Sequence, residues 1–219
     1  AHIQQLDAAF LCRKYPEKHF CTPLYEAKHV LAALEQFVTI NYRRPFTVAG
    51  GVTAEFYEAG HILGSAMTLL TFPKRDGKAG PRVLYTGDVG RPNMPIHRDP
   101  DPFPDADYIL CEGTYGNRLH DPIDDAMAQL ATVVSETFAK GGKVIIPAFA
   151  VGRTQELIYF LHLLSDAKRI PVCDIFVDSP MAVNATSIFR VHPECYDEKI
   201  HEQFLAHHKN PFGFGKVKY

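Results

Sequence analysis

The sequence predicts an α/β protein whose first half is rich in strands and whose second half alternates helices with strands. Short apolar runs bounded by turn residues dominate up to about residue 111, which is typical of strands. Beyond about residue 121, apolar residues at helical spacing alternate with short apolar runs, which indicates a parallel sheet. The 219 residues suit one large domain or two small ones.

The first expected element is a helix over about residues 23–38. Thr22 supplies a hydroxyl N-cap, and Pro23 suits the first helical position. The apolar residues that follow at helical spacing are Ala27, Val30, Leu31, Leu34 and Val38.

Four short strands are expected next. Their ranges are 55–58, 66–72, 83–86 and 108–111. Residues 74–80 read as a polar hairpin turn. Residues 92–107 hold five prolines and four aspartates, so we expect an irregular loop there.

The second half should begin with a helix marked by Met127, Leu130, Val134 and Phe138 and ended by Gly141 and Gly142. A buried strand is expected over 144–147 and another over 172–177. The helix between them is marked by Leu157, Phe160, Leu161 and Leu164. The boundary between the halves lies near His120–Pro122.

Composition limits the possible functions. A formal net charge of −2 gives no general attraction to nucleic acid or to anionic lipid, so a polyanion site would be a local patch. The sequence shows no apolar run long enough to span a membrane, and we expect no signal peptide. Five cysteines without a C-x-x-C pair predict free thiols in a reducing, intracellular compartment. The first and last residues read as the interior of a longer sequence.

Three segments end a strand with a metal-ligand type of side chain beside glycine: His61, Asp88 and Glu112. Each has an ordinary explanation, namely a hydrogen-bonded loop histidine, a turn-capping aspartate and a salt-bridged strand end. Taken together they predict one metal site, with His61 and Asp88 as ligands and Glu112 either to orient a histidine or to transfer a proton. A catalytic zinc needs about three protein ligands, and no H-x-H-x-D-H run supplies the others.

Oxyanion contacts are expected nearby. Ser65 can offer its hydroxyl or backbone N–H. Gly152 and Arg153 stand at a strand-to-helix junction, and Ser179 at the next one. These junctions can equally be ordinary turns. His2 is a weak candidate, and the remaining histidines read as surface or structural: His97, His120, His162, His192, His201, His207 and His208.

Four segments carry a family resemblance: 60–65, 85–91, 111–117 and 146–156. They resemble the β-CASP branch of the metallo-β-lactamase superfamily, which includes RNase J and the endonuclease subunit of the polyadenylation machinery. The opening residues 1–8 are similar to the stretch after the first metal motif of that family.

The resemblance implies a partial metallo-β-lactamase αββα fold over residues 1–120, followed by the start of a β-CASP domain over 121–219. His61 would be a terminal zinc ligand, and Asp88 would bridge two zinc ions. Glu112 would pair with a later histidine that acts as general acid. The implied reaction is two-metal hydrolysis of RNA phosphodiesters, in RNA processing or decay.

The resemblance also implies partners and a location. Single-stranded RNA would lie along basic residues of the second half, namely Arg153, Lys209, Lys216 and Lys218. A homodimer, a cytoplasmic location and no membrane are expected. The H-x-H-x-D-H motif would precede residue 1, and the later histidines would follow residue 219. We therefore expect this chain by itself to lack a complete site and to be inactive.

Two other readings compete with the nuclease. The first is a non-catalytic β-CASP protein that binds RNA or a partner and whose metal motifs have lost their ligands. The presence of His61, Asp88 and Glu112 argues against such a loss. A hydrolase of small esters or thioesters on the same fold would lack the α/β insertion that follows Gly116.

Overall fold

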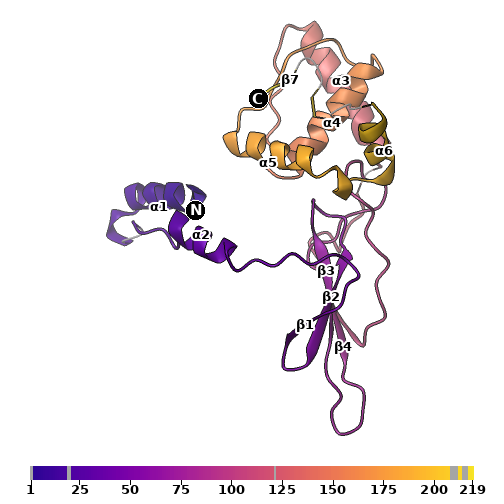
Figure 1. The fold of residues 1–219 in the computed structure, drawn as a ribbon. Helices are drawn as coiled ribbons and strands as arrows, with labels where there is room; N and C mark the ends of the chain where they lie inside the picture. The colour runs from indigo at the N-terminus through magenta and orange to yellow at the C-terminus, as the bar shows by residue number, and fades with distance from the viewer. Residues whose placement is uncertain (1, 19–20, 121, 208–211, 214–216) are drawn as a thin grey trace. The chain divides into compact units, whose positions relative to one another are not determined.

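The computed structural model of the chain describes residues 2–18, 21–120, 122–207, 212–213 and 217–219. The chain divides into two structural units, Ala1–Asn41 and Tyr42–Tyr219. Figure 1 traces both units along the chain, and each is described below by itself.

The first unit is helical and contains a disulfide. Its elements are the α-helix α1 (His2–Lys14), the 3-10 helix η1 (Pro16–Lys18) and the α-helix α2 (Ala27–Leu34). A disulfide joins Cys12 to Cys21, so the prediction of free thiols was wrong for this pair. The chain turns back after α1 and brings the two Cα atoms within 4.7 Å, a normal separation for a disulfide. Cys111, Cys173 and Cys195 are free.

Helix α2 is shorter than the predicted helix over 23–38. Glu26 is its N-cap, and the backbone N–H of Glu26 donates to Nδ1 of His29 at 3.0 Å. This reciprocal cap satisfies the N–H groups of Glu26 and His29, so the helix begins at Ala27, four residues after Pro23.

The second unit begins with a five-stranded sheet in the order β1-β2-β3-β4-β5. The strands are β1 (Phe46–Ala49), β2 (Val52–Glu58), β3 (Ala66–Thr71), β4 (Arg82–Tyr85) and β5 (Tyr108–Leu110). Neighbours are antiparallel except β4 and β5, which are parallel. The four predicted strands are confirmed. The predicted hairpin turn is also confirmed, with Arg75 paired to Lys78 between β3 and β4.

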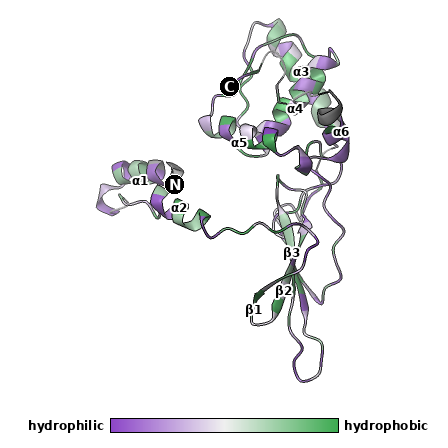
Figure 2. Cartoon of the chain, viewed as in Figure 1, coloured by the Kyte–Doolittle hydropathy of each residue, from purple (hydrophilic) through white to green (hydrophobic). Residues whose placement is uncertain are grey.

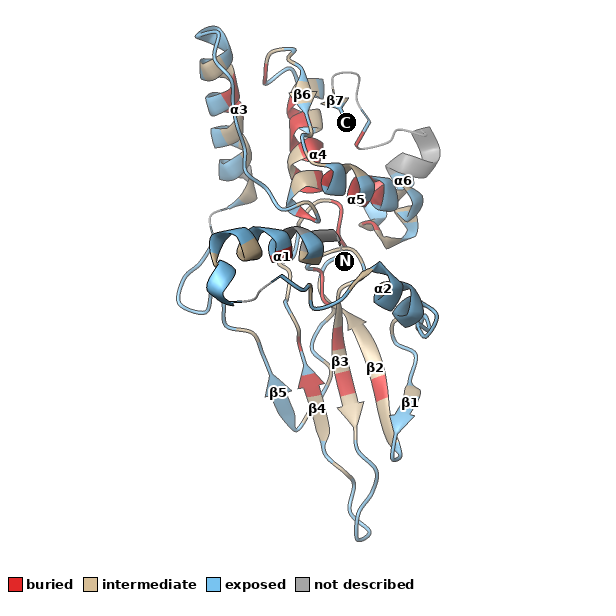
Figure 3. Ribbon diagram, turned by 90° about the vertical axis from the view of Figure 1, so that its left-hand side faces the viewer, coloured by how far each residue is buried: buried red, intermediate tan, exposed pale blue. Residues whose placement is uncertain are grey.

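One face of the sheet is buried. Met67 and Leu69 alternate along β3 and pack with Leu84 of β4. Strand β5 is exposed at all three positions, as its pale blue colour at the sheet edge in Figure 3 shows.

The remainder of the second unit consists mainly of helices. Its elements are α3 (Ile123–Ala139), α4 (Arg153–Asp166), β6 (Ile175–Phe176), α5 (Pro180–Val191), η2 (Pro193–Cys195), α6 (Glu198–His207) and β7 (Val217–Lys218). Strands β6 and β7 are parallel. Figure 2 shows α3, α4 and α5 with mixed hydrophobic and hydrophilic turns, as helices with one apolar face should be. In the described ranges, no helix is both long and apolar enough to cross a bilayer.

Two strand predictions in this half need correction. Residues 144–147 form no strand, and Ile145 is 88% exposed rather than buried. The strand expected over 172–177 is only Ile175–Phe176. A strand requires a ladder partner for its backbone groups, and in the described part of the chain only β7 provides one.

The loop over residues 92–107 is irregular, as predicted, and it enters the core of the helical half. Ile96 is fully buried there with Tyr196, Phe189 and Phe212. The loop therefore connects the sheet to the helices by packing as well as by chain continuity.

Candidate active site at the His61 and Asp88 edge

His61 lies in the turn between β2 and β3, and Ser65 shapes that turn. The Ser65 hydroxyl oxygen accepts hydrogen bonds from the backbone N–H of His61 at 3.0 Å and of Ile62 at 3.2 Å. The Ser65 N–H donates to the Ile62 carbonyl at 2.9 Å. Because this N–H already donates to Ile62, only the hydroxyl proton of Ser65 is left for the predicted phosphate contact. That contact stays a prediction.

Asp88 follows β4 in a loop that fits closely against the His61 turn. The Gly90 N–H donates to the Ala59 carbonyl at 2.8 Å. A Cβ at Gly90 would lie 1.7 Å from the Gly60 carbonyl oxygen, so only glycine allows this approach. As a result, Nε2 of His61 lies 3.7 Å from Oδ2 of Asp88.

This pair fits two ligands of one zinc ion. Ligand atoms about 2.0–2.1 Å from a tetrahedral zinc lie about 3.4 Å from each other. Both side chains are accessible, with exposures of 43% for His61 and 72% for Asp88. Within the described ranges, no three His, Cys, Asp or Glu side chains group as metal ligands.

Glu112 braces the Asp88 loop. Its Oε1 accepts from the Val89 N–H at 2.8 Å, and its own N–H donates to the Thr86 hydroxyl oxygen at 3.3 Å. The Val89 N–H lowers the pKa of Glu112, with further lowering from Thr114 and from His61, so the carboxylate stays ionised. Sequence reasoning missed Thr86, which is fully buried and whose hydroxyl also donates to the Gly87 carbonyl at 2.8 Å, so that it joins the segments before Asp88 and at Glu112.

Gly152 starts helix α4 beside the His61 turn. It has a φ of +83°, and its N–H donates to Oε1 of the buried Gln155 at 2.8 Å. Gln155 also donates to the Thr186 hydroxyl at 2.9 Å, which ties α4 to α5. A Cβ at Gly152 would lie 3.2 Å from Cγ2 of Ile62, so this junction packs against the turn that carries His61.

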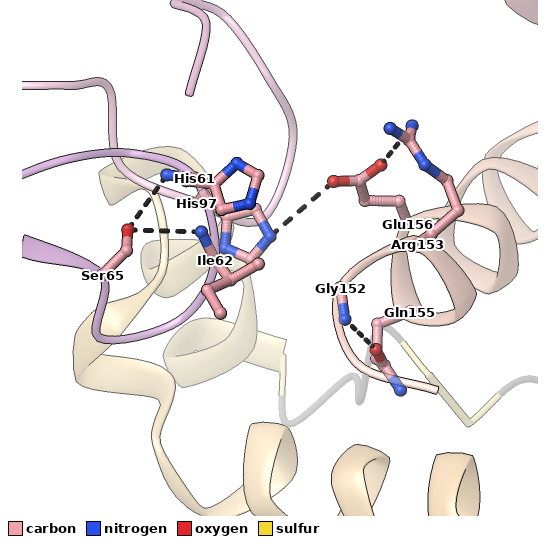
Figure 4. A network of polar contacts seen from close by, with 8 residues as sticks. All are labelled: His61, Ile62, Ser65, His97, Gly152, Arg153, Gln155 and Glu156. Atoms are coloured by element: carbon pink, nitrogen blue, oxygen red, sulfur yellow. Dashed lines mark hydrogen bonds and ion pairs between the residues drawn. The ribbon is translucent and has the colours of Figure 1, made fainter. Parts of the chain in front are cut away.

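Arg153, Glu156 and His97 form a chain of polar contacts beside this turn, drawn in Figure 4. Nη1 of Arg153 lies 2.8 Å from Oε2 of Glu156, and Oε1 of Glu156 lies 3.8 Å from Nε2 of His97. His97 and Glu156 are both buried. The burial of His97 agrees with the structural alternative of its prediction, whereas its place beside Glu156 was not predicted. The apolar Ile96 just before it was the only signal of burial.

Comparison with known proteins identifies the family of the chain. A model of the Beta-Casp domain matches residues 154–219. The chain is 33% identical to the RNase J-like protein of Methanocaldococcus jannaschii over 202 residues, which cover 88% of this chain and 44% of that protein. The chain belongs to the β-CASP family of the metallo-β-lactamase superfamily.

Two further relatives fit the same family. Ribonuclease TTHA0252 of Thermus thermophilus is 37% identical over 163 residues, which cover 74% of the β-CASP chain and 36% of that protein. Endoribonuclease ysh1 of Schizosaccharomyces pombe is 32% identical over 202 residues, with coverages of 89% and 25%. The chain thus spans from a quarter to less than half of the length of these relatives.

The remaining predicted contacts of this β-CASP chain have local partners or cannot be placed. Ser179 caps α5 by accepting from the Ala182 N–H at 3.2 Å, and Lys218 pairs with Asp174 at 2.7 Å. Lys209, Lys216 and His208 lie outside the described residues, as do the side chains of His2 and His207. His162 and His192 pair with Asp166 and Glu194, which agrees with a structural role.

The burial of His97 predicts a loss of stability in acid. Burial, and secondarily His61, lowers its pKa from the ordinary 6.5 to about 4. Between pH 6.5 and pH 4, the unfolded chain therefore binds a proton at His97 while the folded chain does not. The free energy of unfolding is therefore highest above pH 6.5 and decreases as the pH falls towards 4, by about 3 kcal/mol at most. The measurement is thermal unfolding of wild type and His97→Leu from pH 7 to 4. If the difference in stability between wild type and His97→Leu did not change with pH, this prediction would be contradicted.

Proposed function

We propose that the whole protein carrying this chain is a zinc-dependent ribonuclease that hydrolyses phosphodiester bonds of single-stranded RNA, in RNA processing or decay. One observation carries the proposal: the close fit of Gly90 to the His61 turn holds a histidine and an aspartate 3.7 Å apart at an accessible edge. The relatives named ribonuclease and endoribonuclease support RNA as the substrate.

The residues have distinct roles in this proposal. His61 and Asp88 would hold metal, with Asp88 bridging two ions. Two zinc ions would supply charge neutralisation at the phosphoryl group and an activated water at neutral pH. Glu112 keeps the Asp88 loop in place through Val89, and its ionised carboxylate would orient a later histidine that acts as general acid.

The RNA backbone would approach the same edge. The Arg153 side chain is 61% exposed, and the hydroxyls of Ser65 and Ser179 are further candidates for phosphate contacts. We place a metallo-β-lactamase domain over 1–120 and the start of a β-CASP domain over 121–219. A homodimer and a cytoplasmic location remain predictions from the family resemblance.

The test is cleavage by the whole protein of an end-labelled single-stranded RNA, beside DNA of the same sequence and a chromogenic ester. We expect RNA cleavage that stops with a zinc chelator and returns with added zinc. RNA that is bound but never cleaved would indicate a non-catalytic protein instead. Ester hydrolysis without RNA cleavage would indicate a small-substrate hydrolase. The chain by itself is expected to cleave none of the three.

A further inference from the structure

We propose that Glu156 and His97 are positioning residues that hold the Arg153 guanidinium beside the His61 and Asp88 edge, ready for an RNA phosphate. The inference rests on the proposed function, because it assigns the phosphate contact at that site to Arg153. Figure 4 shows the three side chains in one row beside the His61 turn.

Arg153 pairs with Glu156 at the start of helix α4. The Arg153 side chain is 61% exposed, whereas the side chain of Glu156 that pairs with it is only 8% exposed. Glu156 lies in the first turn of α4, where the helix N-terminus favours a negative charge. A buried carboxylate three residues along the same helix limits the directions in which a long arginine side chain can point, which lowers the entropy lost on phosphate binding.

His97 lies against the other carboxylate oxygen of Glu156. Nε2 of His97 faces Oε1 of Glu156 at 3.8 Å, and the His97 side chain is only 4% exposed. In the described part of the chain, this nitrogen is one of two buried side-chain polar atoms without a hydrogen-bond partner. An unpaired buried polar atom costs stability, so an apolar residue beside Phe189 would serve the fold better. The ring instead places a polar edge against the carboxylate.

The loop that carries His97 is anchored on two sides. On one side, the Ile96 carbonyl accepts from the Asp197 N–H at 2.9 Å, and Arg98 donates to the Glu194 carbonyl at 2.6 Å. On the other side, a Cβ at Gly60 would lie 2.7 Å from Pro100, so the same loop packs against the His61 turn. His97 is therefore fixed relative to both the helical core and the candidate ligand His61.

Positioning of this kind should affect substrate binding more than chemistry. Arg153 would contact a phosphate in the ground state and the transition state alike, and uniform binding changes KM rather than kcat. We expect Glu156→Gln to raise KM for single-stranded RNA about tenfold, as for loss of one hydrogen bond to a charged group. His97→Leu should raise KM about threefold, as for a weaker polar contact, without lowering stability at pH 7.

The experiment is a double-mutant cycle in the whole protein with Glu156→Gln and Arg153→Ala. Each single variant should raise KM with kcat within about twofold, and the double variant should resemble Arg153→Ala by itself. Arg75→Ala and Glu136→Gln make the same charge changes at exposed positions and serve as matched controls. A fall in kcat and melting temperature, or a further rise of KM in the Arg153→Ala background, would overturn the proposal.

A second readout separates this proposal from the proposed function. The dissociation constant for labelled single-stranded RNA can be measured by fluorescence anisotropy even if the protein cleaves nothing. The same non-additive pattern in the dissociation constants would support the positioning role while the ribonuclease proposal fails. Equal dissociation constants for wild type, Glu156→Gln and Arg153→Ala would overturn the positioning role.

Discussion

Gly90→Ala is expected to separate the Asp88 loop from the His61 turn and to destabilise the protein by about 3 kcal/mol or more. The added Cβ would lie 1.7 Å from the Gly60 carbonyl oxygen and 2.7 Å from the His61 nitrogen. Both are backbone atoms, so neither can rotate away as a side chain would. One of the two loops must move, and with it the hydrogen bond from Gly90 to Ala59.

Gly113→Ala is the matched control for this variant. A Cβ at Gly113 would meet nothing within 4 Å, and its backbone does not have the left-handed conformation. We expect thermal unfolding of Gly113→Ala to resemble the wild type, while Gly90→Ala melts earlier and loses metal. Equal melting temperatures and equal zinc contents for the two variants would refute the close fit.

Asp88→Asn should lower RNA cleavage by about 10²- to 10³-fold, the loss that follows removal of one preorganised group that stabilises charge. The Asp88 side chain is 72% exposed and lies 3.7 Å from His61, so its charge is available to cations rather than needed by the core. Asparagine keeps the shape of the side chain and removes that charge. Melting temperature should therefore change little while the rate of cleavage falls.

Asp105→Asn removes the same charge from an exposed position in the irregular loop. Its cleavage rate should match the wild type within about twofold, because isolated surface charges contribute little. If Asp88→Asn cleaved RNA as fast as Asp105→Asn, Asp88 could not be a bridging ligand.

The sequence was sufficient to predict features that depend on local pattern. The four strands of the first half and the hairpin turn followed from apolar runs and from glycine, and they are confirmed. His61 and Asp88 were found because each ends a strand beside glycine, and the structure brings their side chains together. Their metal-binding roles stay a prediction.

Features that depend on tertiary contact could not be predicted from the sequence. Glu156 reads as an ordinary first-turn residue, and only packing shows it buried between Arg153 and His97. The strand expected over 144–147 has suitable residues but no ladder in the described part of the chain. The bond between Cys12 and Cys21 depends on how the chain turns after α1, which cysteine spacing does not reveal.

The most direct test is the zinc content of the whole protein, purified without added metal and measured by mass spectrometry beside His61→Ala. We predict about two zinc ions per chain in the wild type, with less in the variant and cleavage of single-stranded RNA lost with the metal. A protein without zinc that binds RNA and leaves it intact would contradict the assignment of His61 and Asp88 as ligands of a catalytic metal site.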